Sequence, residues 1–412
     1  MGAFLGAGAG LLMSLTSSSI DLGLAIEARY RTTVTLPAGV PQRIIEGEAS
    51  PWIKLGLTQA NFELGAEYRP TLTLSDTGRG SALVLHQGRL LGRWQREPGW
   101  LVSALVTGRL GDVNAFQLQE AAGTGGGPVQ LVPSLTSIGY RSLEGTLGLG
   151  ARPGPRHRLM ATLEAAEEGG LALADQRLLP LQRRLRGMLG LEWDARERDV
   201  LLSSLDVVVT QFSTGPNAGV AIWEERWRRT ISPSLVGWIG AGPAVAGEQV
   251  AGVTSVRLRP FAQAGVEYDG QPGGVPVKAG LVIVAAPFVD RVTAAVPERI
   301  GLTATLAIKP NQFWRLEGAA SSGRVLEGLQ QGDEAWAATA MVGRSLGGYV
   351  DLAVGGRARL QRQPRYAISA LDWHGFLAFE LHARKPELVK PDSSDVKDPL
   401  RPRTPGGAEE DK

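Results

Sequence analysis

The sequence predicts an all-β chain, folded as a transmembrane antiparallel up-and-down β-barrel of about 18 strands, with 16 strands as the alternative. Three observations predict this fold: apolar and polar residues alternate, most alternating segments have ten or more residues, and about 18 or 19 such segments follow one another. Successive side chains of a strand point to opposite faces, so each segment has one apolar and one polar face. A tilted strand needs about nine to eleven residues to cross a bilayer.

The first alternating segment, residues 20–36, places Ile20, Leu22 and Leu24 on one face and Asp21 and Gly23 on the other. The same alternation of apolar and polar residues recurs along the chain. The expected strands are 20–36, 51–58, 61–75, 80–96, 99–111, 130–140, 142–152, 156–166, 184–195, 199–213, 217–230, 234–246, 253–269, 276–289, 297–309, 311–321, 334–344, 347–361 and 365–384. Because bacterial single-chain barrels favour even numbers, we expect 18 strands.

The connections between these segments are typical of a barrel. Short ones at 152–155, 269–274 and 309–311 carry the Gly, Pro and Asn residues that tight reversals need. Two are longer, 112–129 and 166–183, and are expected to form outward loops or a plug in the lumen. The second has a modest helical period, which predicts a short helix.

The chain divides into three parts. Residues 1–18 form an apolar segment that resembles the core of a signal peptide without its basic start, so it is either a truncated signal or a genuine mature N-terminus. Residues 19–385 are the expected barrel. From 386 to 412 the composition changes to Pro, Asp, Lys, Glu and Ser without an apolar face, which predicts a disordered tail. No apolar run reaches the roughly 18 residues of a transmembrane helix.

Composition argues against several kinds of chemistry. The chain has 43 basic and 41 acidic residues, so nothing indicates a nucleic-acid partner. It has no cysteine, which excludes disulfides and thiolate chemistry. None of its four histidines is paired with another at short spacing, so we expect no metal and no cofactor. Gly343–Gly347 matches the Gly-x-Ser-x-Gly nucleophile motif around Ser345, but that motif needs a strand-to-helix turn.

The polar face is the candidate functional surface. If the apolar face contacts lipid, charged residues on the other face must line a wet interior, because an Arg or Lys in mid-membrane costs about 2–4 kcal/mol. The residues expected to line the lumen are Glu27, Arg29, Arg31, Glu63, Glu67, Arg69, Arg184, Arg186, Glu192, Asp194, Asp206, Arg257, Arg259, Glu267, Lys278, Arg299, Arg315, Glu317, Arg357 and Arg359. We expect most of them to pair with one another across strands.

Tryptophans near the ends of the expected strands indicate where the membrane boundary lies. Indole rings suit the headgroup region, which predicts an aromatic girdle rather than ordinary strand aromatics. The expected girdle residues are Trp52, Trp94, Trp100, Trp193, Trp223, Trp227 and Trp314.

The chain has alternating strands such as residues 62–74, an Arg-rich polar face and a tail beyond the last strand. In these features it resembles the myxobacterial-type outer-membrane β-barrels, and among them the polysaccharide-export porin group. The resemblance covers about residues 20–385. It implies a role beside a periplasmic polysaccharide export protein. One departure is that about 28 residues follow the final expected strand, whereas barrels usually end on a strand with a terminal aromatic.

The sequence therefore predicts a non-enzymatic channel in the outer membrane of a Gram-negative-type cell, surrounded by outer-membrane lipid. Its expected cargo is hydrophilic, with an exported polysaccharide preferred. Two alternatives stay open: a general or substrate-specific small-solute porin, and an outer-membrane lipase or esterase that uses Ser345, with His374 or His382 as its base.

Overall fold

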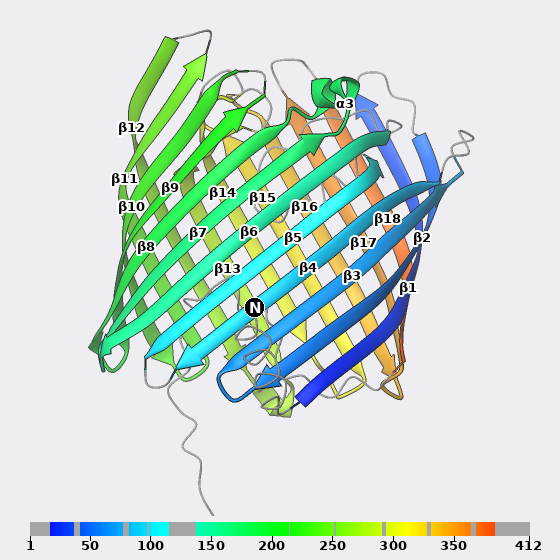
Figure 1. The fold of residues 1–412 in the computed structure, drawn as a ribbon, viewed down its shortest axis with the longest axis horizontal. Coiled ribbons are helices and arrows are strands. Elements are labelled where there is room, and N and C mark those ends of the chain that lie inside the picture. Colours follow the sequence, from blue (N-terminus) through cyan, green and yellow to red (C-terminus); the bar gives the residue numbers. More distant parts are fainter. Residues whose placement is uncertain are drawn as a thin grey trace, which may run out of the picture.

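The computed structural model describes residues 17–36, 42–76, 82–96, 99–114, 137–213, 215–250, 253–290, 294–327, 331–363 and 368–383. These residues form one closed antiparallel barrel (Figure 1). Each strand pairs with the next along the chain, and β1 pairs with β18 from Gly23↔His382 to Leu36↔Ser369, which closes the sheet. The barrel therefore has no free edge, as a membrane-spanning sheet requires.

The elements follow one another in a simple meander. They are β1 (Ser17–Leu36), β2 (Gln42–Gln59), β3 (Phe62–Ser75), β4 (Leu83–Arg96), β5 (Trp100–Asn114), β6 (Ser137–Gly154), β7 (His157–Gly170), α3 (Leu173–Leu178), β8 (Gln182–Arg196), β9 (Asp199–Phe212), β10 (Asn217–Ser232), β11 (Leu235–Val250), β12 (Val253–Gly270), η1 (Pro272–Gly274), β13 (Val277–Pro287), β14 (Glu298–Ile308), β15 (Trp314–Val325), β16 (Glu334–Leu346), β17 (Val350–Gln363) and β18 (Ile368–His382).

The prediction of an 18-stranded all-β barrel is confirmed. The nineteen expected segments reduce to eighteen because those at 130–140 and 142–152 belong to a single strand, β6. The expected strand 51–58 is only the second half of β2. The short helix expected within 166–183 is α3. Most of residues 1–18 and all of the tail 386–412 lie outside the described residues, but Ser17 and Ser18 already belong to β1.

The two ends of the barrel differ in their connections. One end, here called the short-turn end, holds the start of β1, the end of β18 and eight connections of two to six residues, such as 60–61 and 155–156. The other, the long-loop end, holds the longest connections, 115–136, 171–181, 288–297 and 326–333, of which the first lies outside the described residues. This asymmetry is typical of barrels with short turns on one side of the membrane and long loops on the other.

Strand prolines lie opposite one another. Pro243 and Pro260 are Cα partners in the β11–β12 pair. The β2–β3 register stops at Ala49↔Leu72 and resumes at Ile53↔Tyr68, and Pro51 lies in that interval. Proline has no N–H to donate to a ladder, so two facing prolines remove fewer partners than two scattered ones. The interruptions of the ladder are two or three positions long, at residues 50–52 of β2 and 242–243 of β11.

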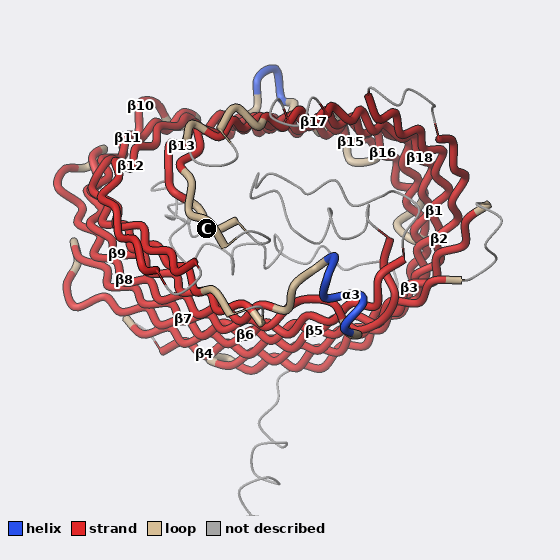
Figure 2. The backbone as a smooth tube through the Cα atoms, turned by 90° about the horizontal axis from the view of Figure 1, so that it is seen from above, coloured by secondary structure: helices blue, strands red, loops and turns tan. Residues whose placement is uncertain are grey.

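Seen along the barrel, the wall is an oval ring (Figure 2). No single apolar core fills the ring, and the described residues have only small buried apolar clusters at the long-loop end. Among the described residues, no helix is long and apolar enough to cross a membrane. A barrel of 16 to 18 strands is wide enough to leave an aqueous interior.

Candidate functional site

The two faces of the wall differ in chemistry. On β12, the outward Val256 and Leu258 are 68% and 73% exposed, whereas Arg257 and Arg259 point to the other face. The same alternation holds on the other strands, where the exposed large apolar side chains share one parity. The outer surface is therefore an apolar band suited to lipid, and the inner surface is polar.

The structure places all twenty predicted lumen residues on the inner face. Each alternates with the exposed large apolar residues of its own strand, Val253 at the first position of β12 being an exception. Seven of them, from six different strands, line one cavity inside the barrel: Glu27, Arg69, Glu267, Lys278, Arg315, Glu317 and Arg357. The inner face, rather than any local motif, is the candidate functional site.

At least nine of the twenty predicted lumen residues form an ion pair with a residue on a neighbouring strand. The tightest cross-strand pairs join β7, β8 and β9: Arg184 lies 2.6 Å from Glu164, and Arg186 binds both carboxylate oxygens of Asp206. Further pairs are Arg29–Glu48 at 2.9 Å, Arg158–Glu192 at 3.0 Å, Lys278–Asp269 at 3.0 Å and Arg257–Glu248 at 3.5 Å. The wall is charged but locally balanced.

The densest charge cluster lies at the seam where β18 meets β1. Arg31 is 3% exposed and lies 3.3 Å from Asp372 on β18 and 3.8 Å from Glu46 on β2. Arg29 is also buried and contacts both Glu27 and Glu48. A buried arginine without a partner would be strongly destabilising, so these acids on both neighbouring strands offset the cost of burying the two guanidinium groups.

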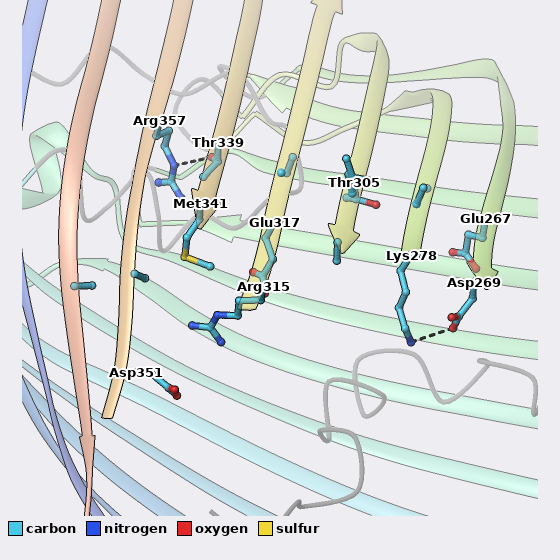
Figure 3. Close-up of a pocket in the computed structure, with 18 of the residues that line it drawn as sticks. Glu267, Asp269, Lys278, Thr305, Arg315, Glu317, Thr339, Met341, Asp351 and Arg357 are labelled. Atoms are coloured by element: carbon cyan, nitrogen blue, oxygen red, sulfur yellow. Dashed lines mark hydrogen bonds and ion pairs between the residues drawn. The ribbon is translucent and has the colours of Figure 1, made fainter. Parts of the chain in front are cut away.

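A cavity of about 1220 Å³ occupies the lumen towards the short-turn end (Figure 3). Its lining carries seven carboxylates and five Arg or Lys side chains, together with hydroxyls such as Thr305 and Thr339. Figure 3 shows Arg315 and Glu317, from β15, projecting into this space. Among the described residues neither forms an ion pair, so both can contact a solute.

Two connections at the long-loop end fold back onto the inner wall. In the β13–β14 connection, Ala294 and Val296 are buried against an apolar patch of the inner face of β9, β10 and β11, formed by Phe212, Ala218, Val220 and Ala246. The Val296 N–H donates to the Glu248 carboxylate at 3.0 Å. Ala294 has a φ of 56°, a conformation that a non-glycine residue holds only when its surroundings impose it.

The β15–β16 connection is fastened to the same wall. Glu327 forms a 2.5 Å ion pair with Arg259 on the inner face of β12. Asp333, at the other end of this connection, is 6% exposed and lies close enough to Asp290 of the β13–β14 connection to be repelled by its charge. Burial, and next the Asp290 charge, raise the pKa of Asp333 above its ordinary value. These two segments, here called the inward loops, narrow the long-loop end of the lumen.

The structure places six of the seven predicted girdle tryptophans on the outer face. Four of them, Trp94, Trp100, Trp193 and Trp314, lie at the short-turn ends of their strands. Trp52 is a correction: it is only 4% exposed and shares the inner face of β2 with Glu48 and Ser50. Its ring packs on His382, because Gly23 on the neighbouring strand leaves space that a Cβ would fill.

The serine motif does not have the geometry of a nucleophile elbow. Ser345 lies near the end of β16, and a turn at 347–349 leads directly into the antiparallel β17. Its partner across that pair is Asp351, and the Asp351 carboxylate, rather than Ser345, lies next to His382 at 3.5 Å. The motif is therefore part of a hairpin in a barrel wall.

Several inner-face residues escaped the sequence analysis. Glu46 and Glu48 lie in the first half of β2, which the expected strand 51–58 leaves out, and Asp372 and His374 lie in the expected strand 365–384 without having been assigned to the lumen. Glu327 lies in a connection, where alternation gives no signal. Extending the expected strand 51–58 to the true start of β2 would have identified Glu46 and Glu48, because both alternate in step with Ser50 on the inner face.

Several solved structures resemble this barrel in fold. The FrpB iron transporter from Neisseria meningitidis superimposes with a TM-score of 0.50 at 8% identity, over 86% of this chain and 63% of that chain. OpdO from Pseudomonas aeruginosa gives a TM-score of 0.48 at 11% identity, over 90% of this chain and all of that chain. OccAB1 from Acinetobacter baumannii gives a TM-score of 0.46 at 9% identity, over 89% of this chain and 97% of that chain. No curated protein matches the sequence.

The sequence itself carries a family signature. The model of the EpsX exopolysaccharide export family matches residues 12–257, which is more than half of the chain. Those residues run from before β1 into β12 and include the arginine pairs of β7 to β9 and the β1 and β2 members of the seam cluster, but not Asp372. The chain folds as an 18-stranded β-barrel and belongs to the EpsX exopolysaccharide export family.

Proposed function

We propose that this protein is the passive outer-membrane conduit for an exported exopolysaccharide. The observation that carries the proposal is a wide inner cavity with a charged but internally balanced wall, in a chain of the EpsX family. A balanced wall presents many donors and acceptors without a strong net field. A hydrated sugar chain can exchange such weak contacts and leave again, as conduction requires.

The asymmetry of the barrel supports a direction for export. Outer-membrane barrels keep their short turns in the periplasm and their longer loops outside the cell. The short-turn end, with the cavity and both ends of the described barrel, is then the periplasmic entrance. The inward loops stand at the external exit. A periplasmic polysaccharide export protein would dock at the entrance, and outer-membrane lipid would surround the apolar band.

Single-channel recording in planar bilayers tests this proposal. We expect a steady ionic current that falls when exopolysaccharide, purified from the strain that encodes the chain, is added on the short-turn side. An open current that the glycan does not reduce, combined with permeation of small sugars, would contradict export and favour a small-solute porin.

Neighbouring residues on opposite faces of β15 provide a matched pair of variants. Arg315 projects into the cavity, whereas Leu316 points outward and is 38% exposed. Loss of one charged hydrogen bond of about 1.5–3 kcal/mol in Arg315→Ala should weaken the glycan block roughly 10- to 100-fold. Leu316→Ala should leave the block unchanged. Equal effects of the two substitutions would show that the glycan does not pass along this wall.

A further inference from the structure

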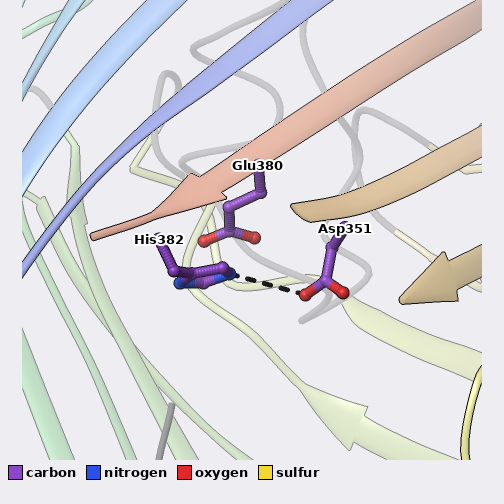
Figure 4. A group of neighbouring side chains, drawn as sticks. All are labelled: Asp351, Glu380 and His382. Carbon is purple, nitrogen blue, oxygen red and sulfur yellow. Dashed lines mark ion pairs between the residues drawn. The ribbon is translucent and has the colours of Figure 1, made fainter. Parts of the chain in front are cut away.

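Three metal-binding side chains meet on the inner face at the short-turn end (Figure 4). Asp351 begins β17, and Glu380 and His382 end β18. Asp351 and Glu380 are direct partners across the two strands, and His382 lies two residues further along the same face. One ligand atom from each residue lies within 4.8 Å of the other two.

The histidine of this cluster is oriented but not satisfied by protein. The Trp52 ring packs against the imidazole at a centroid distance of 5.5 Å. Both ring nitrogens of His382 are shielded from solvent, and neither has a hydrogen-bond partner among the described residues. Its nearest charged neighbour is the Asp351 carboxylate, 3.5 Å from Nε2. Shielded polar atoms without partners usually signal a missing ligand, water or ion.

The charges of the cluster favour a cation. Two carboxylates held this close repel each other unless a positive charge lies between them. Lys54 does not serve this purpose, because its Nζ lies over the Trp52 ring, 4.7 Å from the centroid. The cluster faces the water-filled lumen, so water can complete the coordination of a bound ion.

We propose that Asp351, Glu380 and His382 bind one divalent transition-metal ion at the short-turn mouth of the barrel, zinc being the best fit. Imidazole nitrogen together with carboxylate oxygen is a donor set of zinc, whereas calcium and magnesium prefer oxygen alone. Zinc ligands lie about 2.0–2.2 Å from the ion, so a small rotation of the side chains closes the present spacing. The site is independent of the cargo.

The position of the site gives the ion a structural role. It would link β17 to β18 at the last residue of the final strand, where Gly23 of β1 pairs with His382 and closes the barrel. Bound metal would therefore stabilise the seam at its short-turn end, directly before residues 383–412.

Titration of the purified, tag-free full-length protein with Zn²⁺ against a chromophoric chelator tests the proposal. We expect one zinc per chain, no competition by equal Ca²⁺ or Mg²⁺, and a zinc-dependent rise in the thermal unfolding midpoint. His382→Asn and Glu380→Gln should each weaken binding by at least about tenfold, the smallest loss seen when even a supporting group is removed. Both substitutions are close to isosteric, and circular dichroism verifies the barrel.

His157→Asn is the matched control, because His157 also lies at the short-turn end but stacks on Trp193 on the outer face. It should bind zinc as the parent does. Unchanged binding in His382→Asn and Glu380→Gln would overturn the proposal, and so would the absence of a one-to-one complex in the parent. Equal displacement by Ca²⁺ would overturn the assignment to a transition metal.

Discussion

The opposite environments of adjacent residues can be tested at the middle of β8. Leu189 points outward, is 60% exposed and lies midway along the strand, opposite Leu205 of β9. Met188 points inward, opposite Asp206. Arginine at the lipid-facing midplane costs about 2–4 kcal/mol. Leu189→Arg should therefore lower the folded-to-unfolded ratio roughly 30- to 700-fold.

Met188→Arg places the same side chain in a wet lumen beside an acid, so its cost should stay within about 0.5 kcal/mol. The assay is equilibrium unfolding by guanidinium of the barrel folded into phospholipid vesicles. The midpoint should fall clearly for Leu189→Arg and hardly for Met188→Arg. A similar loss in both variants, or none in Leu189→Arg, would refute the assignment of the two faces.

Three further predictions concern the inward loops and the seam. Asp333 has a raised pKa, so loop packing should be strongest below its ordinary value of 3.8 and weaken as pH rises through the raised pKa. Fluctuations of the single-channel current should then increase with pH in the parent but not in Asp333→Asn. The same increase with pH in both proteins would contradict this prediction. Glu327→Gln should speed hydrogen exchange at 331–333, whereas Arg324→Gln, which removes an outward-facing ion pair with Glu334, should not. Gly23→Ala should cost about 1–3 kcal/mol by overlap with Trp52, whereas Gly47→Ala, with open space around its Cβ, should be nearly neutral, as measured by denaturant unfolding.

The fold was predictable because a barrel wall has a strict period. Side chains alternate between lipid and water on every strand, so Leu258 and Arg259 reveal their faces without knowledge of their neighbours. The strand borders were harder, since residues 42–50 of β2 alternate weakly. Trp52 was misplaced because a tryptophan near a strand end suits either face, and only the space at Gly23 decides between them.

The candidate site was predictable only in outline. Alternation identifies residues that face the lumen, but not which of them meet. Glu327 reaches Arg259 from a connection that has no periodic signal. Asp351 and His382 are 31 positions apart and come together only through the pairing of β17 with β18. The expectation of no metal rested on spacing along the chain, which does not report spacing across strands.

Cysteine labelling tests the central claim, a hydrophilic lumen that the glycan occupies, most directly. The chain has no cysteine, so single substitutions give a clean signal. Met341 lines the cavity, whereas Val342 points outward and is 41% exposed. In vesicles, a charged thiol reagent should label Met341→Cys but not Val342→Cys, and exopolysaccharide should protect Met341→Cys. Equal labelling of both variants, or labelling of Met341→Cys that the glycan does not slow, would contradict a hydrophilic lumen that the glycan occupies.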